Sequence, residues 1–176
     1  MYTYIIAEGR ATPCLGHRMK MLFWIVVTAV VVHGLVAGIS FDVATVKLPT
    51  RKRIGAIAYA RFARGNDMGN GIVVYPTVAV LALLLVAAAT VTAYFMHKPE
   101  AILLPLFAAC GGTIAHFLCT AKAAPNMLSL RNAADDEAFL ARKLDAFAAW
   151  HAYRALFQFL TFVALVWALV ATSQTA

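Results

Sequence analysis

The sequence predicts an all-α protein that crosses a membrane with four helices packed into a bundle. Composition is the first reason, because 62% of the 176 residues are hydrophobic and only 13% are charged. A soluble domain of this length could not hide so much apolar surface. Spacing is the second reason, because the apolar residues form four runs near the ~20 residues that a helix needs to cross a bilayer.

The predicted membrane helices cover residues 21–46, 72–96, 101–121 and 150–171, and we assign residues 21–176 to one transmembrane domain. Residues 1–20 show no clear periodicity, so we expect a disordered N-terminal tail there. A basic stretch before an apolar run is also the pattern of a cleaved signal peptide. This run, however, is long enough to span a membrane, which favours retention.

The connection between the first two membrane helices is expected to contain an amphipathic helix. Apolar residues recur there at helical spacing beside arginines and lysines, a pattern typical of a helix lying among lipid headgroups. The predicted apolar stripe is Ile54, Ile57, Ala58 and Phe62. The glycine-rich GNDMGNG that follows predicts a flexible turn into the second membrane helix.

The connection between the third and fourth membrane helices has a similar pattern. Pro125 and Asn126 mark the break after the third helix. An acidic first turn then opens a second amphipathic helix, which can run unbroken into the fourth membrane helix. Its predicted apolar stripe is Phe139, Leu140, Leu144 and Phe147.

Positive charge is unevenly divided between the two ends of the predicted bundle. The net charge is +7, yet of the 15 Lys and Arg residues only Arg10, Arg18, Lys20 and Lys98 lie on the side of the termini. Because cytoplasmic loops are enriched in Lys and Arg, we expect a multi-pass cell-membrane protein with cytoplasmic connections and both termini outside. The basic residues flank apolar runs, so the expected partner is the lipid bilayer and not nucleic acid.

The sequence carries no motif of a thiol redox enzyme or a metal centre. Cys14, Cys110 and Cys119 form no CxxC pair, which argues against disulfide chemistry. No HExxH motif and no paired metal-binding carboxylates occur, so we predict no metal site. The GNDMGNG stretch lacks a following GKS or GKT, which argues against a phosphate-binding loop.

Polar residues inside the apolar runs are the candidate functional residues, because isolated charges are costly in lipid. Four such residues lie about three to six residues inside the cytoplasmic ends of their helices, on the order of 5–9 Å deep. They are Asp42, Tyr75, His116 and Arg154. Their common depth predicts a polar pocket that opens toward the cytoplasm.

Structural roles for the same residues stay open. Asp42 can pair with Arg154 or Arg64 to hold the bundle together, and Arg154 can extend to the lipid headgroups. Gly34 and Gly38 form a small-residue face, which fits packing within the bundle or against a second copy of the chain.

A haem-binding role is open as well. His33 and His116 lie at similar depth in helices of the same direction, so they can serve as the two axial ligands of a haem. On this reading the chain is an electron-transfer protein.

Short motifs spread along the chain point to a family. The chain has VKLP after the first helix, YARFARGND and then YP at the second, APNMLSL after the third, and aromatic–His–x–x–Arg at the fourth. From Met21 to Ala171 it thereby resembles the anthrone oxygenase-like family of small four-helix membrane proteins. The resemblance implies oxidation of a polycyclic anthrone by molecular oxygen, with no metal or flavin. The residues that match are Pro49, Asn126, Trp150, His151 and Arg154.

Residues and resemblance together support three hypotheses of function. The first is a membrane-embedded oxygenase or oxidoreductase acting on a hydrophobic, aromatic or quinone-like small molecule. In it His116 or His151 removes a proton and Arg154 stabilises the resulting oxyanion. The second is a non-enzymatic membrane subunit or ligand-binding module, and the third is the haem protein. The candidates are His116, His151, Arg154 and Asp42 for catalysis, and Tyr75, Gln158, Asn126 and Trp150 for substrate binding.

Overall fold

The computed structural model describes residues 13–174, and every regular element within that range is a helix. The elements in chain order are α1 (Pro13–Asp42), the π-helical η1 (Val43–Lys47), α2 (Leu48–Ile54), α3 (Ala56–Gly65), the π-helical η2 (Asn66–Asn70), α4 (Gly71–Phe95), α5 (Glu100–Leu128) and α6 (Glu137–Ser173). The predicted tail falls, for residues 1–12, outside the described residues.

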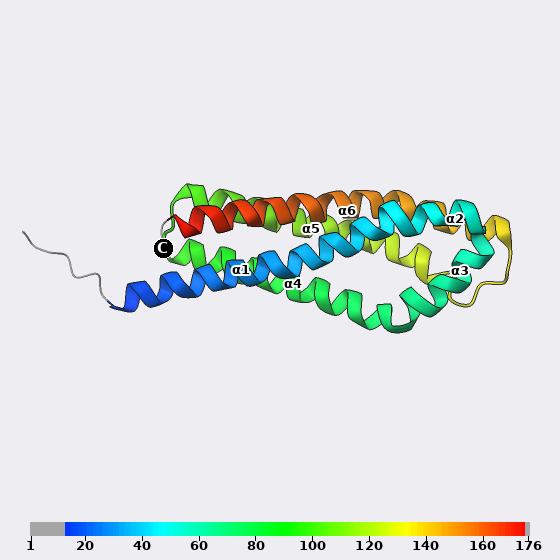
Figure 1. Cartoon of the computed structure of the whole chain (residues 1–176), viewed down its shortest axis with the longest axis horizontal. Coiled ribbons are helices and arrows are strands. Elements are labelled where there is room, and N and C mark those ends of the chain that lie inside the picture. The colour runs from blue at the N-terminus through cyan, green and yellow to red at the C-terminus, as the bar shows by residue number, and fades with distance from the viewer. Residues whose placement is uncertain (1–12, 175–176) are drawn as a thin grey trace, which may run out of the picture.

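Four continuous helical stretches are long and apolar enough to cross a membrane, as predicted: Met19–Ile54, Ala56–Phe95, Glu100–Leu128 and Glu137–Ser173. They pack lengthwise into an elongated bundle, with α5 and α6 side by side (Figure 1). We call the end formed by α2, α3 and the α5–α6 connection the basic end. The opposite end holds the α4–α5 connection and the C-terminus of α6 (Figure 1).

Helix α6 begins with a side-chain cap. Asp136 is the N-cap of α6, and its side chain accepts a hydrogen bond from the amide of Phe139 at 3.1 Å. The helix then runs unbroken for 37 residues through the predicted connection helix into the fourth span. Pro125 does not end the third span as predicted, since α5 continues to Leu128. Pro125 has no amide hydrogen, so the helix lacks one backbone hydrogen bond at this position but continues past it.

The predicted turn GNDMGNG is instead largely helical. It forms η2, which departs from helical geometry only at Gly69, with φ −84° and ψ −116°. Immediately after it, a Cβ added at Gly71 would lie 2.7 Å from the ring of Tyr75 and 2.9 Å from the carbonyl oxygen of Asn66. The glycine therefore allows Tyr75 to pack against the start of α4.

The amphipathic helix α3 forms, but of the predicted stripe only Ile57 packs against the core. Phe62 is 48% exposed and Ile54 47%. The buried face consists of Ala56, Tyr59, Ala60 and Ala63. Small alanines let α3 approach α6 closely, whereas hydrophobicity alone favoured the larger side chains. In the second connection the predicted stripe is confirmed for Leu140, Leu144 and Phe147, which are buried.

Polar contacts attach α2 and α3 to the rest of the basic end. Glu137 accepts hydrogen bonds from the amides of Ala56 at 2.8 Å and Ile57 at 3.2 Å. Arg61 is hydrogen-bonded to Asp135 and lowers the pKa of that carboxyl below its ordinary value. These contacts connect residues about 75–80 positions apart in sequence, which is why the connection between the first two spans is ordered.

The hydrophobic core is divided into two clusters along the bundle. The cluster away from the basic end includes Leu22, Val26, Val86, Ile102, Leu106 and Leu165. The cluster at the basic end includes Val43, Tyr59, Met127, Leu140, Leu144 and Phe147. Between them lies a group of buried polar residues, and this is where the candidate site is found.

Candidate functional site

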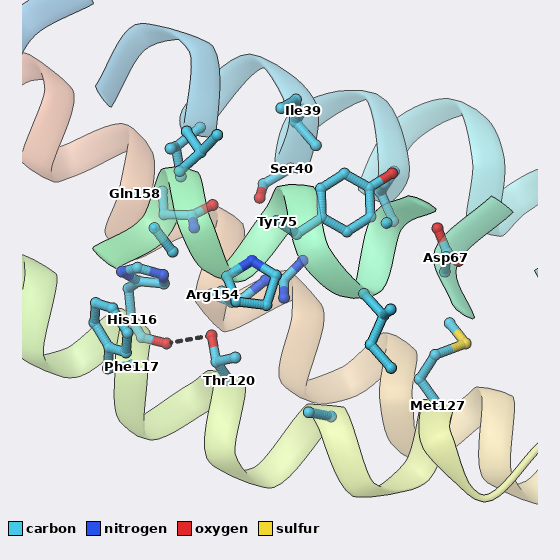
Figure 2. A pocket seen from close by; sticks show the side chains of 18 of the residues that line it. Ile39, Ser40, Asp67, Tyr75, His116, Phe117, Thr120, Met127, Arg154 and Gln158 are labelled. Atoms are coloured by element: carbon cyan, nitrogen blue, oxygen red, sulfur yellow. Dashed lines mark hydrogen bonds between the residues drawn. The ribbon is translucent and has the colours of Figure 1, made fainter. Parts of the chain in front are cut away.

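A cavity of about 290 Å³ lies inside the bundle, toward the basic end. Its wall is mostly apolar and is built from α1, η2, α4, α5 and α6 (Figure 2). A volume near 300 Å³ with a few polar groups on an apolar wall is typical of a small-molecule site.

One side of the cavity is thinly covered. Between Gly71 and Ala82, no residue of α4 is buried. Ile72, Pro76 and Val80 from this stretch line the cavity and are also exposed at the outer surface of the bundle. In a membrane that surface faces the hydrocarbon of the lipid, so the cavity borders the bilayer along α4.

Arg154 is the principal polar group in the cavity (Figure 2). Its Nε is buried and has no hydrogen-bond partner. Among the described residues, no carboxylate oxygen lies within 4.0 Å of a guanidinium nitrogen of Arg154, the distance limit of an ion pair. A guanidinium on an apolar wall without an ion-pair contact is costly, which points to a role toward a ligand.

His116 and Gln158 lie beside Arg154. His116 on α5 and Gln158 on α6 are each 3% exposed, and both line the cavity. Gln158 is one helical turn after Arg154, and its Oε1 has no hydrogen-bond partner. Tyr75 from α4 completes the set of predicted residues that meet here (Figure 2). The structure thus brings four of the eight predicted site residues together.

Three predicted residues lie elsewhere. Asp42 does not line the cavity, because it pairs with Lys47 at 3.3 Å across the wider π-helical turn of η1. Asn126 donates a hydrogen bond to the carbonyl oxygen of Lys122 at 3.0 Å, in its own helix. Trp150 is 40% exposed and its ring packs near that of Tyr153. The convergence of Asp42 with His116 and Arg154 is therefore not found.

His151 is fully buried next to the cavity without lining it. Its Nε2 donates a hydrogen bond to the carbonyl oxygen of Ser40 on α1, at 3.1 Å. Its ring also stacks on Phe147, with centroids 5.3 Å apart. The residue fixes α6 against α1, and so fixes the helix that carries Arg154.

Asp67 lines the cavity but is not among the predicted site residues. It lies within GNDMGNG, which was interpreted as a flexible turn. Asp67 and Tyr75 are eight residues apart, so a helix continuing through this stretch would place both on one face. That spacing could have predicted Asp67 as a site residue, but the glycines of this stretch favoured a turn over a helix.

The residues do not fit a haem held by His33 and His116. His33 is buried outside the cavity lining, and its Nε2 lies 3.5 Å from the hydroxyl of Thr113. Two axial ligands must face one space from opposite sides, and only His116 faces the cavity. In the described part of the chain, no three His, Cys, Asp or Glu side chains are grouped to hold a metal ion.

The chemistry available in the cavity is that of oxyanion stabilisation and proton transfer. A guanidinium in a low-dielectric site stabilises a negative oxygen more strongly than it does in water. An imidazole beside it can accept a proton from the same ligand. Apolar walls around both groups select a hydrophobic ligand.

Comparisons of the chain with known proteins add no assignment. No protein-family model matches it, and no curated protein or solved structure matches it either. The function is therefore inferred from the residues of the cavity.

Proposed function

We propose that this membrane protein binds a hydrophobic ring compound bearing a phenolic, carboxylate or quinone-like oxygen, and that it promotes oxidation of that compound. The observation that carries the proposal is Arg154, a guanidinium without an ion-pair contact on the wall of a mostly apolar cavity, whose Nε has no hydrogen-bond partner. An anionic oxygen of the ligand would form the ion pair that Arg154 lacks.

The ligand would enter from the lipid. The cavity borders the membrane along the part of α4 that has no buried residue, and exposed apolar side chains line that border. A hydrophobic ring compound concentrates in the bilayer, so this route needs no aqueous opening. The excess of Lys and Arg at the basic end favours a cytoplasmic location for that end, with both termini outside.

The proposed chemistry begins with a proton transfer. His116 accepts a proton from the ring compound, and Arg154 stabilises the negative oxygen that forms. Gln158 and Tyr75 orient the ring, while His151 keeps α6 in place through its bond to Ser40. The resemblance to the anthrone oxygenase-like family supplies the oxidation step. Molecular oxygen adds to the deprotonated ring carbon to give a hydroperoxide, and cleavage of its O–O bond with loss of water leaves a ring carbonyl, so that one oxygen atom enters the product and the other leaves as water.

A non-enzymatic ligand-binding protein would use the same cavity and would differ only in the lack of turnover. The alternative in which Arg154 is a structural clamp for Asp42 has no support, since Asp42 pairs with Lys47.

The test is binding of 2-naphthoate, measured by its fluorescence, to the protein in nanodiscs of neutral lipid, with empty nanodiscs as the blank. We expect saturable binding that Arg154→Gln weakens at least tenfold, as for loss of a charge-assisted hydrogen bond. Arg142→Gln is the matched control, because Arg142 is an exposed arginine outside the cavity. Equal affinity of all three proteins would refute the site.

Turnover is tested separately, by oxygen uptake with anthrone as substrate. Oxygen uptake that is lost when His116 or Arg154 is replaced supports the proposal that the protein is an enzyme. Binding without uptake above that of empty nanodiscs identifies a ligand-binding protein.

A further inference from the structure

The cavity contains a second unpaired charge, of opposite sign to Arg154. Asp67 from η2 lines the same space (Figure 2). The carboxylate of Asp67 accepts a hydrogen bond from the side-chain amide of its neighbour Asn66, at 2.8 Å. Among the described residues, no Lys, Arg or His nitrogen lies within 4.0 Å of its carboxylate oxygens.

This lack of a partner is unusual at the basic end, where the other acidic side chains are engaged. Asp42, Asp135 and Asp145 are in ion pairs. Asp136 caps α6 and Glu137 accepts the first amides of α3. Asp67 is thus the carboxylate left without an ion pair at the cavity, just as Arg154 is a half-buried guanidinium without one, and its buried Nε has no hydrogen-bond partner.

The two charges are held apart by the fold. Opposite charges in a low-dielectric cavity attract strongly, and flexible side chains would close into an ion pair. Arg154 belongs to the continuous helix α6, whereas Asp67 is held in η2 next to the buried Met68. Packing of Gly71 against Tyr75 fixes this segment further.

We propose that Asp67 and Arg154 bind opposite ends of one ligand. Arg154 takes its anionic oxygen, and Asp67 accepts a hydrogen bond from a hydroxyl group at the other end of the ring system. The ligand class is therefore a hydroxylated aromatic compound that also carries an acidic or phenolic oxygen. This inference rests on the proposed function and makes Asp67 a specificity-determining residue of the same site.

The experiment compares two probes that differ by one hydroxyl group, 6-hydroxy-2-naphthoate and 2-naphthoate, in neutral-lipid nanodiscs. We expect the hydroxylated probe to bind the intact protein about tenfold more tightly, the increment of a hydrogen bond to a charged acceptor. Asp67→Ala abolishes this ratio. It does not weaken 2-naphthoate, which has no hydroxyl group for Asp67 to accept from, because removing a negative charge from the cavity can only favour an anionic probe. Arg154→Gln weakens both probes by a similar factor.

Glu100→Ala is the matched control, since it removes an exposed carboxylate outside the cavity and keeps the tenfold ratio. If Asp67→Ala does not elute as native protein, Asp67→Asn takes its place, because it keeps the shape and removes the charge. Asp67→Asn is expected to lose most of the tenfold preference for 6-hydroxy-2-naphthoate over 2-naphthoate.

The outcomes separate the two proposals. Equal binding of both probes to the intact protein, or a ratio that persists in the Asp67 variants, overturns the role of Asp67. In either case dependence on Arg154 still supports the proposed function. Binding of neither probe to the intact protein overturns both.

Discussion

His151 of α6 donates a hydrogen bond to the backbone carbonyl of Ser40 of α1, and the two atoms are 3.1 Å apart. This contact crosses the bundle one turn before Arg154 in the same helix. Ser40 itself lines the cavity. The bond therefore fixes the position of Arg154 relative to the opposite wall, which makes His151 a positioning residue in the proposed site.

Loss of this bond is expected to destabilise the bundle. His151→Phe keeps the ring and its stacking on Phe147 but removes the donor, leaving one buried hydrogen bond unmade. We expect a loss of about 1 kcal/mol in the free energy of unfolding. The measurement is unfolding in mixed micelles by increasing the fraction of sodium dodecyl sulfate. Trp150→Phe, at the exposed neighbour, should change little, and an equal effect of both variants would contradict a specific role for His151.

Two glycines differ sharply in the space around them. A Cβ at Gly71 would clash with Tyr75 and with a backbone carbonyl, whereas a Cβ at Gly38 meets nothing within 4 Å. Gly71→Ala should therefore cost roughly 1–3 kcal/mol and displace Tyr75, with weaker 2-naphthoate binding. Gly38→Ala should be neutral or stabilising by up to about 1 kcal/mol, because alanine is the better helix former. Unfolding and probe titration of both variants check this, and equal stability would show that the close packing at Gly71 is not maintained.

A second pair of glycines tests the contact between α5 and α6. A Cβ at Gly112 would clash with the hydroxyl oxygen of Thr161, while a Cβ at the adjacent Gly111 meets nothing within 4 Å. Gly112→Ala forces Thr161 to rotate away from its bond to the carbonyl of Phe157, at a cost of about 1–2 kcal/mol. Gly111→Ala is the control in the same unfolding assay. A larger loss of stability in the control than in Gly112→Ala would argue against this packing.

Glu137 is expected to stabilise α3 from a distance in sequence. Its carboxylate accepts the amides of Ala56 and Ile57 at the helix start, where the preceding Gly55 has φ +84°. Glu137→Ala should weaken α3 by about 1 kcal/mol, as for loss of an N-cap. Faster hydrogen exchange confined to residues 56–65 is the expected readout. Exchange that stays at the rate of the intact protein would show that the carboxylate does not cap α3.

The membrane orientation can be checked by chemical labelling. The native cysteines Cys14, Cys110 and Cys119 are first replaced by alanine, and single cysteines are then placed at Asn132 and at Glu100. Both positions are exposed and lie at opposite ends of the bundle. We expect an impermeant maleimide to label Glu100→Cys in intact cells and Asn132→Cys only after permeabilisation. The reverse pattern would invert the proposed orientation.

Much of the architecture was predictable because it depends on local sequence. Length and hydropathy of a run decide whether a helix can span lipid, and all four predicted spans appear. The unbroken α6 follows in the same way, since its apolar stripe continues into the fourth span without a helix breaker. The α3 stripe failed because the choice of face depended on how closely α6 approaches, and small alanines were favoured over Phe62.

The candidate site was predictable only in part. Depth along a helix can be counted from sequence, and three of the residues predicted at a common depth, Tyr75, His116 and Arg154, line one cavity. Direction around the helix axis cannot be counted in this way when the helix changes its pitch. The π-helical turn of η1 brings Lys47 to Asp42, and η2 turns Asp67 toward the cavity instead.

The sequence by itself determined that this chain forms four apolar helices with basic connections, and which polar residues lie at one depth. These properties depend on composition and on a fixed rise per residue, which neighbouring helices do not alter. Only the tertiary structure decided that Asp67, and not Asp42, shares the cavity with Arg154. That choice depends on kinks, on π-helical turns and on which cation lies nearest each carboxylate, and these are set when the helices pack together.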